Sequence, residues 1–381
     1  MPNLKQTESI TILCSLDLDP KSRKDIIKNL SGAVLSHQGK FLWLGTDEFT
    51  SIERLTKIAD AENTFADHKR FHLKDFIADF EEEQGEIDIE GLDYHGNYLW
   101  LIGSHSSKRK KAKINPDKFK LEKNELKKIE RQENRYLLAR IPVNESGELE
   151  AESTAWLPRN GSSNSLMQAL ANDEYLDLAT IIKSKDGGSS PGKEVYFYLP
   201  SKENGLDIEG LAVCHNQILI GLRGPVLRGI AILLEIEVEA SLPPELSLKA
   251  IGNQERLYKR HFLDLNGLGI RELCWEDDGE SLLILAGPTM DLDGALQLFR
   301  LKQPLALEDD SLSSTQNQQL EYLGDIPHGF KSDRAEGLAL YGSEAILVVY
   351  DSPNQARIIL DDNHDIVGVQ TDVYSTSSDR D

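Results

Sequence analysis

An all-β fold built from repeated four-stranded units is what this sequence predicts, and three observations predict it. The first is a repeat: the pentapeptide Asp-Ile-Glu-Gly-Leu occurs at 88–92 and again at 207–211, and related stretches begin at Ser31, Gly269 and Asp333. The second is local pattern, because each copy consists of a short apolar strand, a turn with Gly, Asn or Asp, and a second apolar strand. This pattern is typical of a β-hairpin.

Further alternating runs flank these hairpins. One follows each copy, in the order "SIERLTK", "RYLLARIPV", "GIAILLEIEVE", "GALQLFRLK" and "QARIILDD". Another precedes most copies, as in "HKRFHLKDF", "KEVYFYLP", "LYKRHFLDL" and "QLEYLGDIP". Alternation of apolar and polar residues indicates half-buried strands, so each unit is expected to hold four strands.

The third observation is the period. The Glu positions fall at 90, 209, 272 and 336, with Ala33 in that position in the weakest copy, so the spacings are 57, 119, 63 and 64 residues. The long interval contains two insert-like segments, 107–134 and 160–190, without which it is close to the common period. Four-stranded units at this interval are the signature of a β-propeller. Five blades are countable, and a sixth, degenerate blade at 149–161 is the alternative.

Closure of such a ring needs a strand from one terminus in the blade formed by the other. The run "ITILCSLDL" at 10–18 stands where an outer strand would precede the first hairpin. We therefore expect it to complete the last blade. The expected organisation is a single propeller domain over 1–372, followed by a disordered polar tail at 373–381.

The two inserts differ in character. Residues 108–135 hold twelve Lys or Arg against five Asp or Glu, which predicts a charged helix and loop standing out from the second blade. This basic arm (107–134) is interpreted as a solvated excursion, a lid over the propeller mouth or a partner-docking arm. Residues 165–182 have apolar positions at helical spacing and predict an amphipathic helix capped by Ser163 or Ser165, within the second insert.

Net charge and cysteine usage restrict the possible partners and the cellular compartment of the protein. A net charge of −22 argues against nucleic acid and anionic membranes as partners. No apolar run reaches membrane-spanning length, and the N-terminus lacks a signal-peptide pattern. The three cysteines stand singly in apolar stretches, which favours buried thiols in a reducing compartment and predicts a cytoplasmic location.

The first strand of each blade lines a propeller's central channel, so the Glu at its start is expected at one mouth. Loops after the second strands open onto the same face. We expect a polar ligand site there, composed of Glu90, His105, Lys202, Asp207, Glu209, Arg223, Arg271, Glu272, Arg334, Glu336 and Asp351. The four carboxylates Glu90, Glu209, Glu272 and Glu336 are the candidate metal ligands, for which Ca²⁺ or Mg²⁺ is the suitable ion. The alternative is a structural role in which each Glu accepts backbone N–H bonds.

Three functions follow from this site. The first is binding of a small polar or anionic ligand, with or without a divalent cation. The second is metal-assisted hydrolysis of a phosphoester, other ester or lactone, and the third is a protein-interaction platform. The sequence has no nucleophile elbow, P-loop, H-E-x-x-H motif or dinucleotide fingerprint.

Several of these stretches carry a resemblance to a known family: "LPSKENGLDIEGLAV", "ILIGLRGP", "GIRELCW", "LLILAGP" and "RAEGLAL". They resemble the bacterial family catalogued as domain of unknown function number 3616, over about 30–360. The Glu-Gly-Leu-Ala motif is also similar to one in esterase-like phytase and SdiA-regulated propellers, a resemblance that implies calcium or phosphate-ester chemistry. The first copy departs from that motif at Ala33, so no metal geometry is carried over. Both resemblances imply a propeller.

Overall fold

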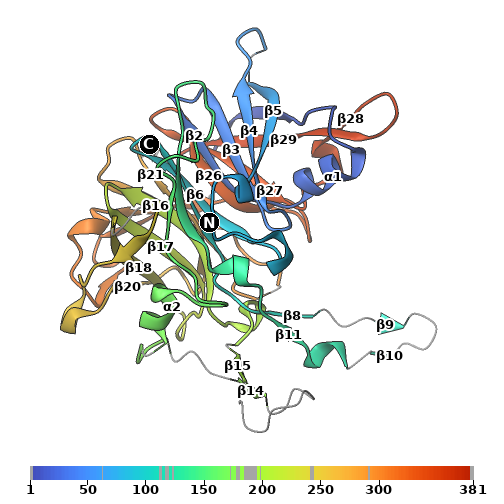
Figure 1. Ribbon diagram of the computed structural model, residues 1–381. Helices are drawn as coiled ribbons and strands as arrows, with labels where there is room; N and C mark the ends of the chain where they lie inside the picture. Colours follow the sequence, from blue (N-terminus) through green and yellow to red (C-terminus); the bar gives the residue numbers. More distant parts are fainter. Residues whose placement is uncertain are drawn as a thin grey trace, which may run out of the picture.

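The computed structural model describes residues 3–61, 63–110, 114–115, 120–121, 124–171, 173–176, 181–183, 195–197, 199–240, 244–290 and 292–377. Within these residues the fold is all-β, and Figure 1 shows the strands grouped into sheets around a common centre. The predicted fold class is confirmed.

The described strands fall into groups of four along the chain, and a short parallel pairing of β1 (Gln6–Leu13) with β5 (Thr64–His72) joins the first and last groups into one nine-stranded sheet. The first contains β2 (Leu30–Ser36), β3 (Phe41–Thr46), β4 (Ser51–Lys57) and β5 (Thr64–His72). The second contains β6 (Ile89–His95), β7 (Tyr98–Gly103), β12 (Leu138–Pro142) and β13 (Ala155–Trp156). The third contains β16 (Asp207–Cys214), β17 (Gln217–Gly224), β18 (Ala231–Ala240) and β20 (Lys259–Leu263). The fourth contains β21 (Gly269–Trp275), β22 (Ser281–Gly287), β23 (Gln297–Lys302) and β25 (Leu320–Asp325).

The last sheet joins the two ends of the chain. It contains β26 (Arg334–Leu340), β27 (Ala345–Asp351), β29 (Ile366–Ser375) and β1 (Gln6–Leu13), and β1 is antiparallel to β29. Figure 1 shows these blue and red segments side by side. Completion of the last blade by the N-terminal strand is confirmed. Because β29 runs to Ser375, residues 373–375 of the expected tail are strand, and 378–381 lie outside the described residues.

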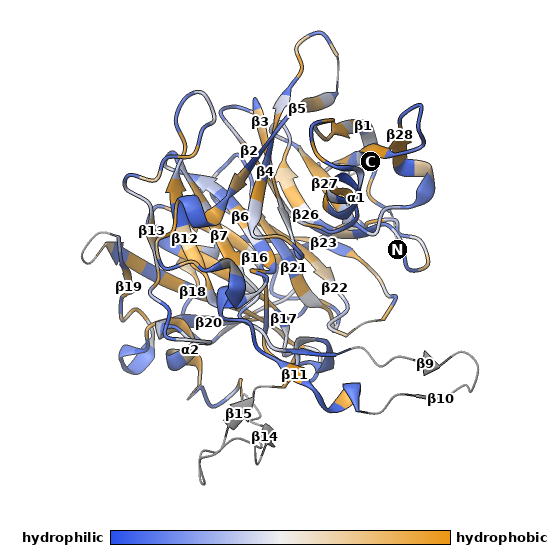
Figure 2. Ribbon diagram, turned by 45° about the vertical axis from the view of Figure 1, so that its right-hand side comes forward, coloured by the Kyte–Doolittle hydropathy of each residue, from blue (hydrophilic) through white to orange (hydrophobic). Residues whose placement is uncertain are grey.

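The innermost strands β2, β6, β16, β21 and β26 contact one another in a closed cycle. Between each pair of neighbouring sheets lies one cluster of buried apolar side chains. Figure 2 shows the hydrophobic residues concentrated in the strands and the hydrophilic ones in the loops. The sheets are therefore held face to face by apolar burial, as the alternating pattern requires.

The second blade takes its outer strand from the segment that was a candidate sixth blade. Strand β13 lies within 149–161 and pairs with β12, whereas β15 (Val195–Phe197), in the competing segment "KEVYFYLP", pairs with β14 (Ile181–Lys183). Other short strands extend the sheets. Strand β19 (Leu246–Leu248) pairs with β18, strand β24 (Ser311–Ser313) pairs with β20, and strand β28 (Ile358–Leu360) pairs with β29.

Both inserts differ from expectation. The base of the basic arm is a β-hairpin rather than a helix: β8 (Lys108–Arg109) pairs with β11 (Ile129–Glu130), and further out β9 (Ile114–Asn115) pairs with β10 (Lys120–Leu121). The predicted long helix is α2 (Ser165–Leu170), capped by Asn164, whose side chain accepts from the Met167 amide. The sequence also missed α1 (Pro20–Lys28), which Asp19 caps.

The glycine of the repeated pentapeptide permits the inner strands to approach one another. A Cβ on Gly91 would lie 2.7 Å from the Leu211 Cβ and 2.8 Å from its amide nitrogen. Gly32, at the same repeat position in β2, has space: its nearest neighbour, the Leu92 Cγ, would lie 3.5 Å from an added Cβ.

Gly91→Ala is accordingly expected to destabilise the fold by about 1–3 kcal/mol, the usual cost of overpacking. Gly32→Ala is the matched control and should cost less than about 1 kcal/mol. Urea unfolding of both variants measures the difference, and equal costs would mean that close strand approach is not what selects glycine at this position.

Candidate functional site

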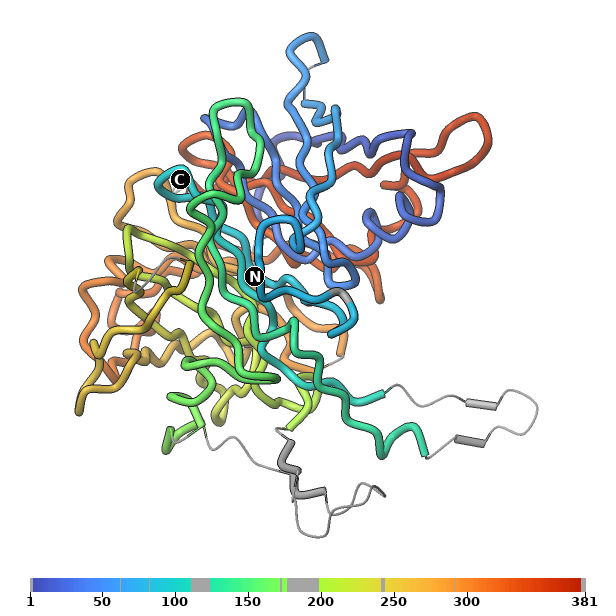
Figure 3. Tube along the Cα trace, in the orientation of Figure 1, coloured from blue at the N-terminus to red at the C-terminus, as the bar shows by residue number. Residues whose placement is uncertain are grey.

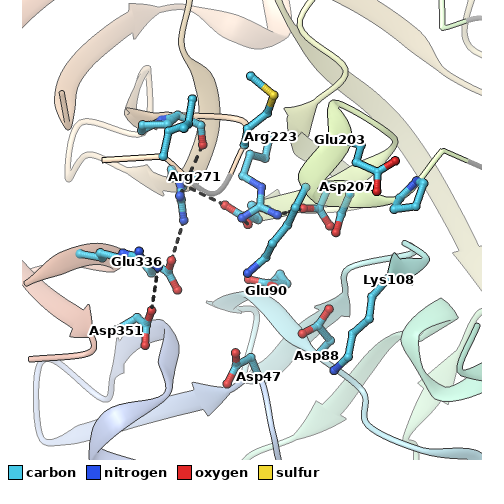
Figure 4. Close-up of a pocket in the computed structure, with 18 of the residues that line it drawn as sticks. Asp47, Asp88, Glu90, Lys108, Glu203, Asp207, Arg223, Arg271, Glu336 and Asp351 are labelled. Carbon is cyan, nitrogen blue, oxygen red and sulfur yellow. Dashed lines mark hydrogen bonds and ion pairs between the residues drawn. The ribbon is translucent and has the colours of Figure 1, made fainter. Parts of the chain in front are cut away.

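A cavity of about 540 Å³ lies at the mouth where the inner strands begin. Eleven carboxylate side chains line it: Asp47, Glu48, Glu86, Asp88, Glu90, Glu203, Asp207, Glu209, Asp293, Glu336 and Asp351. Eight cationic side chains line it as well: Lys108, Arg109, Lys110, Arg135, Lys202, Arg223, Arg271 and Arg334. Figure 4 shows the central members of this set facing one another from different sheets.

A β-bulge near the start of each inner strand helps to position this set. The strand register shifts around Ser31, Glu90, Glu209, Arg271 and Glu336. A bulge leaves a residue out of the ladder and re-aims its side chain. All of these except Ser31 line the cavity, and Ser31 instead donates to the backbone oxygen of Ile89.

This register corrects two sequence assignments. In β2 the position of Glu90 is held by Ser31 and not by Ala33, because the bulge lies between Leu30 and Gly32. In β21 the bulge position is held by Arg271, and Glu272 takes the place that Gly has in the other copies. Glu272 is fully buried outside the cavity lining, and its Oε1 accepts from the Leu273 amide at 2.9 Å. Burial raises its pKa well above the ordinary value.

Ion pairs join the mouth residues into a chain of alternating charge. Arg223 pairs with Asp207 and, at 2.6 Å, with Glu209. Arg271 lies 3.6 Å from Glu209 and 2.6 Å from Glu336. Burial alone would lower the pKa of Arg223, but Asp207 and Glu209 raise it above its ordinary value. Burial also raises the pKa of Asp207, and that of Glu209 to about 8, although the arginines oppose this rise. Figure 4 follows the chain across three inner strands.

A second group of ion pairs ties the basic arm to the mouth. Arg135, from η4 (Glu133–Tyr136), lies 2.5 Å from Asp88 and 3.2 Å from Glu86. Lys108 lies 2.9 Å from Glu86, and Arg109 pairs with Glu203 in η5 (Ser201–Glu203). The first residues of the arm are thus part of the cavity wall.

Glu90 and Asp47 are among the mouth carboxylates that stand outside these ion pairs. Neither Glu90 nor Asp47 makes an ion pair with any described residue, and Asp47 Oδ1 is buried without a hydrogen-bond partner among them. Burial, then the neighbouring Glu209 and Asp88, raise the pKa of Glu90 well above its ordinary value. Burial, then Asp88 and Glu336, raise the pKa of Asp47 to about 8. Both groups favour a bound proton, or a donor from a ligand, over an isolated charge.

Nine of the eleven predicted ligand residues line the cavity, and His105 and Glu272 do not. His105 is fully buried; its Nδ1 is 2.7 Å from the Gly103 oxygen and its Nε2 2.8 Å from the Asn164 amide nitrogen. Burial lowers its pKa to about 4. This side chain therefore supports the backbone of the second sheet instead of facing the mouth.

The expected set of four metal-binding glutamates is not assembled. No group of three or more His, Cys, Asp or Glu side chains with metal-binding geometry occurs among the residues that the structure describes. Two features account for this: Glu272 turns away from the cavity, and Arg271 pairs with both Glu209 and Glu336. Glu209 and Glu336 thus neutralise an arginine.

The family model described as "Protein of unknown function (DUF3616)" matches residues 29–368. The chain belongs to this family. A comparison with curated proteins finds no match. In this DUF3616 member, no helix within the described ranges is long and apolar enough to cross a membrane.

Solved structures similar to this DUF3616 chain include propellers of differing function. One is the PQQ-bound aldose sugar dehydrogenase of Streptomyces coelicolor, with 11% identity, a TM-score of 0.38, and coverage of 98% of this chain and 100% of that one. Another is the Myceliophteria thermophila Cps50 (Swd1) β-propeller domain, with 10% identity, a TM-score of 0.35, and coverage of 92% and 98%. A putative 6-phosphogluconolactonase of Bacteroides fragilis has 11% identity, a TM-score of 0.34, and coverage of 89% and 82%.

Sequence reasoning missed several cavity residues of the DUF3616 chain, notably Asp88, Arg135 and Lys108. Asp88 had a usable signal, because it stands two residues before Glu90 as Asp207 does before Glu209. Arg334 holds the same offset from Glu336. Lys108 had none, since it lies in the insert, outside the repeat. Arg135 begins the run "RYLLARIPV" directly after the insert, and no other run at this place in a unit begins with Arg or Lys.

Proposed function

We propose that the protein binds a small, hydroxyl-rich polar ligand in the mouth cavity, and that anionic groups on this ligand contact the exposed Lys202. One observation carries the proposal. Glu90 and Asp47, which we refer to as the floor of the cavity, are hydrogen-bond acceptors without ionic partners among the described residues, in a cavity that ion pairs also line. A cavity of about 540 Å³ has the size of a small-molecule site.

Because the arginines are already paired, the cavity favours a ligand that binds by hydrogen bonds over one that binds by its negative charge. Arg223 and Arg271 are already neutralised by two carboxylates each. A multiply charged anion would have to displace those partners, whereas a polyol donates hydrogen bonds to carboxylates and accepts them from guanidinium groups without breaking the pairs. Preorganised charge of this kind costs nothing further at the moment of binding.

The test is a binding screen with sorbitol, myo-inositol, gluconate and glucose 6-phosphate, measured by thermal shift and calorimetry. Glu90→Gln is expected to weaken the binding of any ligand that binds wild-type protein by about two- to tenfold, because the Gln amide nitrogen cannot accept a hydrogen bond and one hydrogen bond contributes about 0.5–1.5 kcal/mol. Glu152→Gln, at an exposed carboxylate outside the cavity lining, is the control. Equal affinity of the ligand for wild type and Glu90→Gln would exclude a role for the floor.

A hydrolase is the second candidate, and the raised pKa of Asp47 favours it. A carboxyl group with a pKa of about 8 is protonated at neutral pH and is able to act as a general acid. Glu336, which pairs with Arg271, lies in the same cavity and would serve as the base that activates water. A screen of esters and lactones, with and without Ca²⁺ or Mg²⁺, tests both this route and the metal-assisted one. Turnover that survives Asp47→Asn would exclude the general-acid role.

A further inference from the structure

Apolar side chains gather at the rim of the charged mouth. Leu126, Met290 and Leu292 line the same cavity as the ion pairs and are 36%, 46% and 60% exposed. Phe330 is 82% exposed in the loop between β25 and β26 and does not itself line the cavity, but His328 of the same loop does. We refer to Leu126, Met290, Leu292 and Phe330 as the apolar rim.

The rim comes from three separate parts of the chain. Leu126 lies in η3 (Glu125–Lys127) of the basic arm. Met290 and Leu292 lie between β22 and β23. The loop that carries Phe330 is tied to this second segment, because the Lys331 amide donates to Asp293 Oδ1 at 3.1 Å. The Cα trace in Figure 3 shows the arm leaving the sheets at this end of the molecule.

Exposed apolar side chains that converge on one cavity differ from scattered surface hydrophobics. Large apolar residues exposed to water are costly, and groups of them mark binding sites. Here the rim borders a floor that contains the acceptors Glu90 and Asp47. A ligand that satisfies both surfaces has a polar end and an apolar end.

We infer that the mouth binds a small amphiphile, with its polar head on the Glu90 and Asp47 floor and its alkyl or aryl portion on the apolar rim. This inference rests on the proposed function, because the floor is assigned the head group. It adds the apolar part, which no polyol has. The binding surface is then continuous from the floor to the opening of the cavity.

Size and charge argue against larger occupants. A stable protein interface buries about 800 Å² on each partner, which four partly exposed side chains do not supply. An anionic membrane surface would be repelled by a chain of net charge −22. A soluble small molecule fits the cavity volume of about 540 Å³.

The probe is anilinonaphthalene sulfonate, a fluorescent amphiphile whose emission reports on an apolar site whatever head group the natural ligand carries. We expect one saturable site on wild-type protein. The double variant Met290→Ser/Leu292→Ser is expected to weaken binding about tenfold, because two partly buried apolar side chains are lost. Leu312→Ser/Leu360→Ser is the matched control, since both leucines are exposed and neither lines the cavity. Circular dichroism and melting curves verify that each variant is folded.

Each outcome decides the inference. Weaker binding in the rim variant, with control and wild type alike, supports it. Equal binding in the rim variant and wild type overturns it, as does an equal loss in the control or no saturable binding at all. Sedimentation with phosphatidylcholine vesicles that is lost in the rim variant would overturn it in favour of a membrane contact.

The same experiment separates the rim from the floor. If no polyol binds wild-type protein but anilinonaphthalene sulfonate binding depends on the rim, the proposed head group is wrong and the apolar subsite stands. A second outcome is that polyols bind, that Glu90→Gln weakens their binding, and that the rim variant binds the fluorescent probe as well as wild type does. In that case the floor is supported as a binding site and the amphiphile is excluded.

Discussion

Replacing Arg223 by Met is expected to destabilise the protein by about 3–5 kcal/mol, the cost of removing one partner from a buried ion pair. Its guanidinium pairs with Asp207 and Glu209, both of which are buried. The variant would leave these two carboxylates close together without their shared cation. Urea unfolding at pH 7 measures the loss.

Two further variants show whether charge or packing causes that loss. Arg228→Met is the control, because Arg228 is exposed in the loop between β17 and β18, and it should change stability by less than about 0.5 kcal/mol. Adding Glu209→Gln and Asp207→Asn to Arg223→Met should recover a large part of the stability, since the uncompensated charges are gone. No recovery would mean that the arginine stabilises the mouth mainly by packing its aliphatic stem.

Replacing Asp47 by Asn is expected to flatten the dependence of stability on pH. The folded-state pKa of Asp47 is about 8, above the ordinary value of 3.8. A raised carboxyl pKa means that the folded protein retains a proton which the unfolded chain releases above about pH 4. This contribution to stability is complete below about pH 4, and it falls through the window from about pH 4 to 8 as pH rises.

Asn does not titrate, so Asp47→Asn should gain stability relative to wild type as pH increases from about 5 to 8. The full slope for one proton is about 1.4 kcal/mol per pH unit, and water in the cavity screens part of it, so we expect a relative gain of about 1–3 kcal/mol. Asp93, whose pKa burial raises to about 7, acts in the same direction in both proteins and cancels in the comparison.

Urea unfolding at about pH 5, 6.5 and 8 provides the measurement. Asp17→Asn, at an exposed position, is the control and should run parallel to wild type. Parallel curves for Asp47→Asn as well would show that Asp47 is ionised in the folded protein and that its neighbours compensate its charge. The general-acid route of the hydrolase candidate, which needs a protonated Asp47, would then fail too.

The candidate site could be predicted from the sequence where its residues belong to the repeat. Glu90, Glu209 and Glu336 occupy one position in their units, and all three line the cavity. The fourth unit misled the alignment, because "RELCW" offers a Glu one residue beyond the bulge. Aligning Ile270 with Ile89 and Ile208 would have placed Arg271 in the site. A bulge changes strand register by one residue and leaves no composition signal of its own.

The sequence by itself determined the strands, their grouping into units and the strand from the N-terminus that joins the last sheet, because alternation and turn residues act locally and repeat at a common period. It also placed acidic and basic residues at one end of the inner strands. Only the tertiary structure decided which charges neutralise one another. Arg271, Glu209 and Glu336 lie in three different sheets, and Arg271 pairs with both carboxylates. Lys108 reaches the mouth from the insert, and Arg135 reaches it from the residue directly after the insert. Glu90 and Asp47 have no ionic partners among the described residues. Electrostatic energy depends on distance and burial across the ring, and neither quantity is encoded in spacing along the chain.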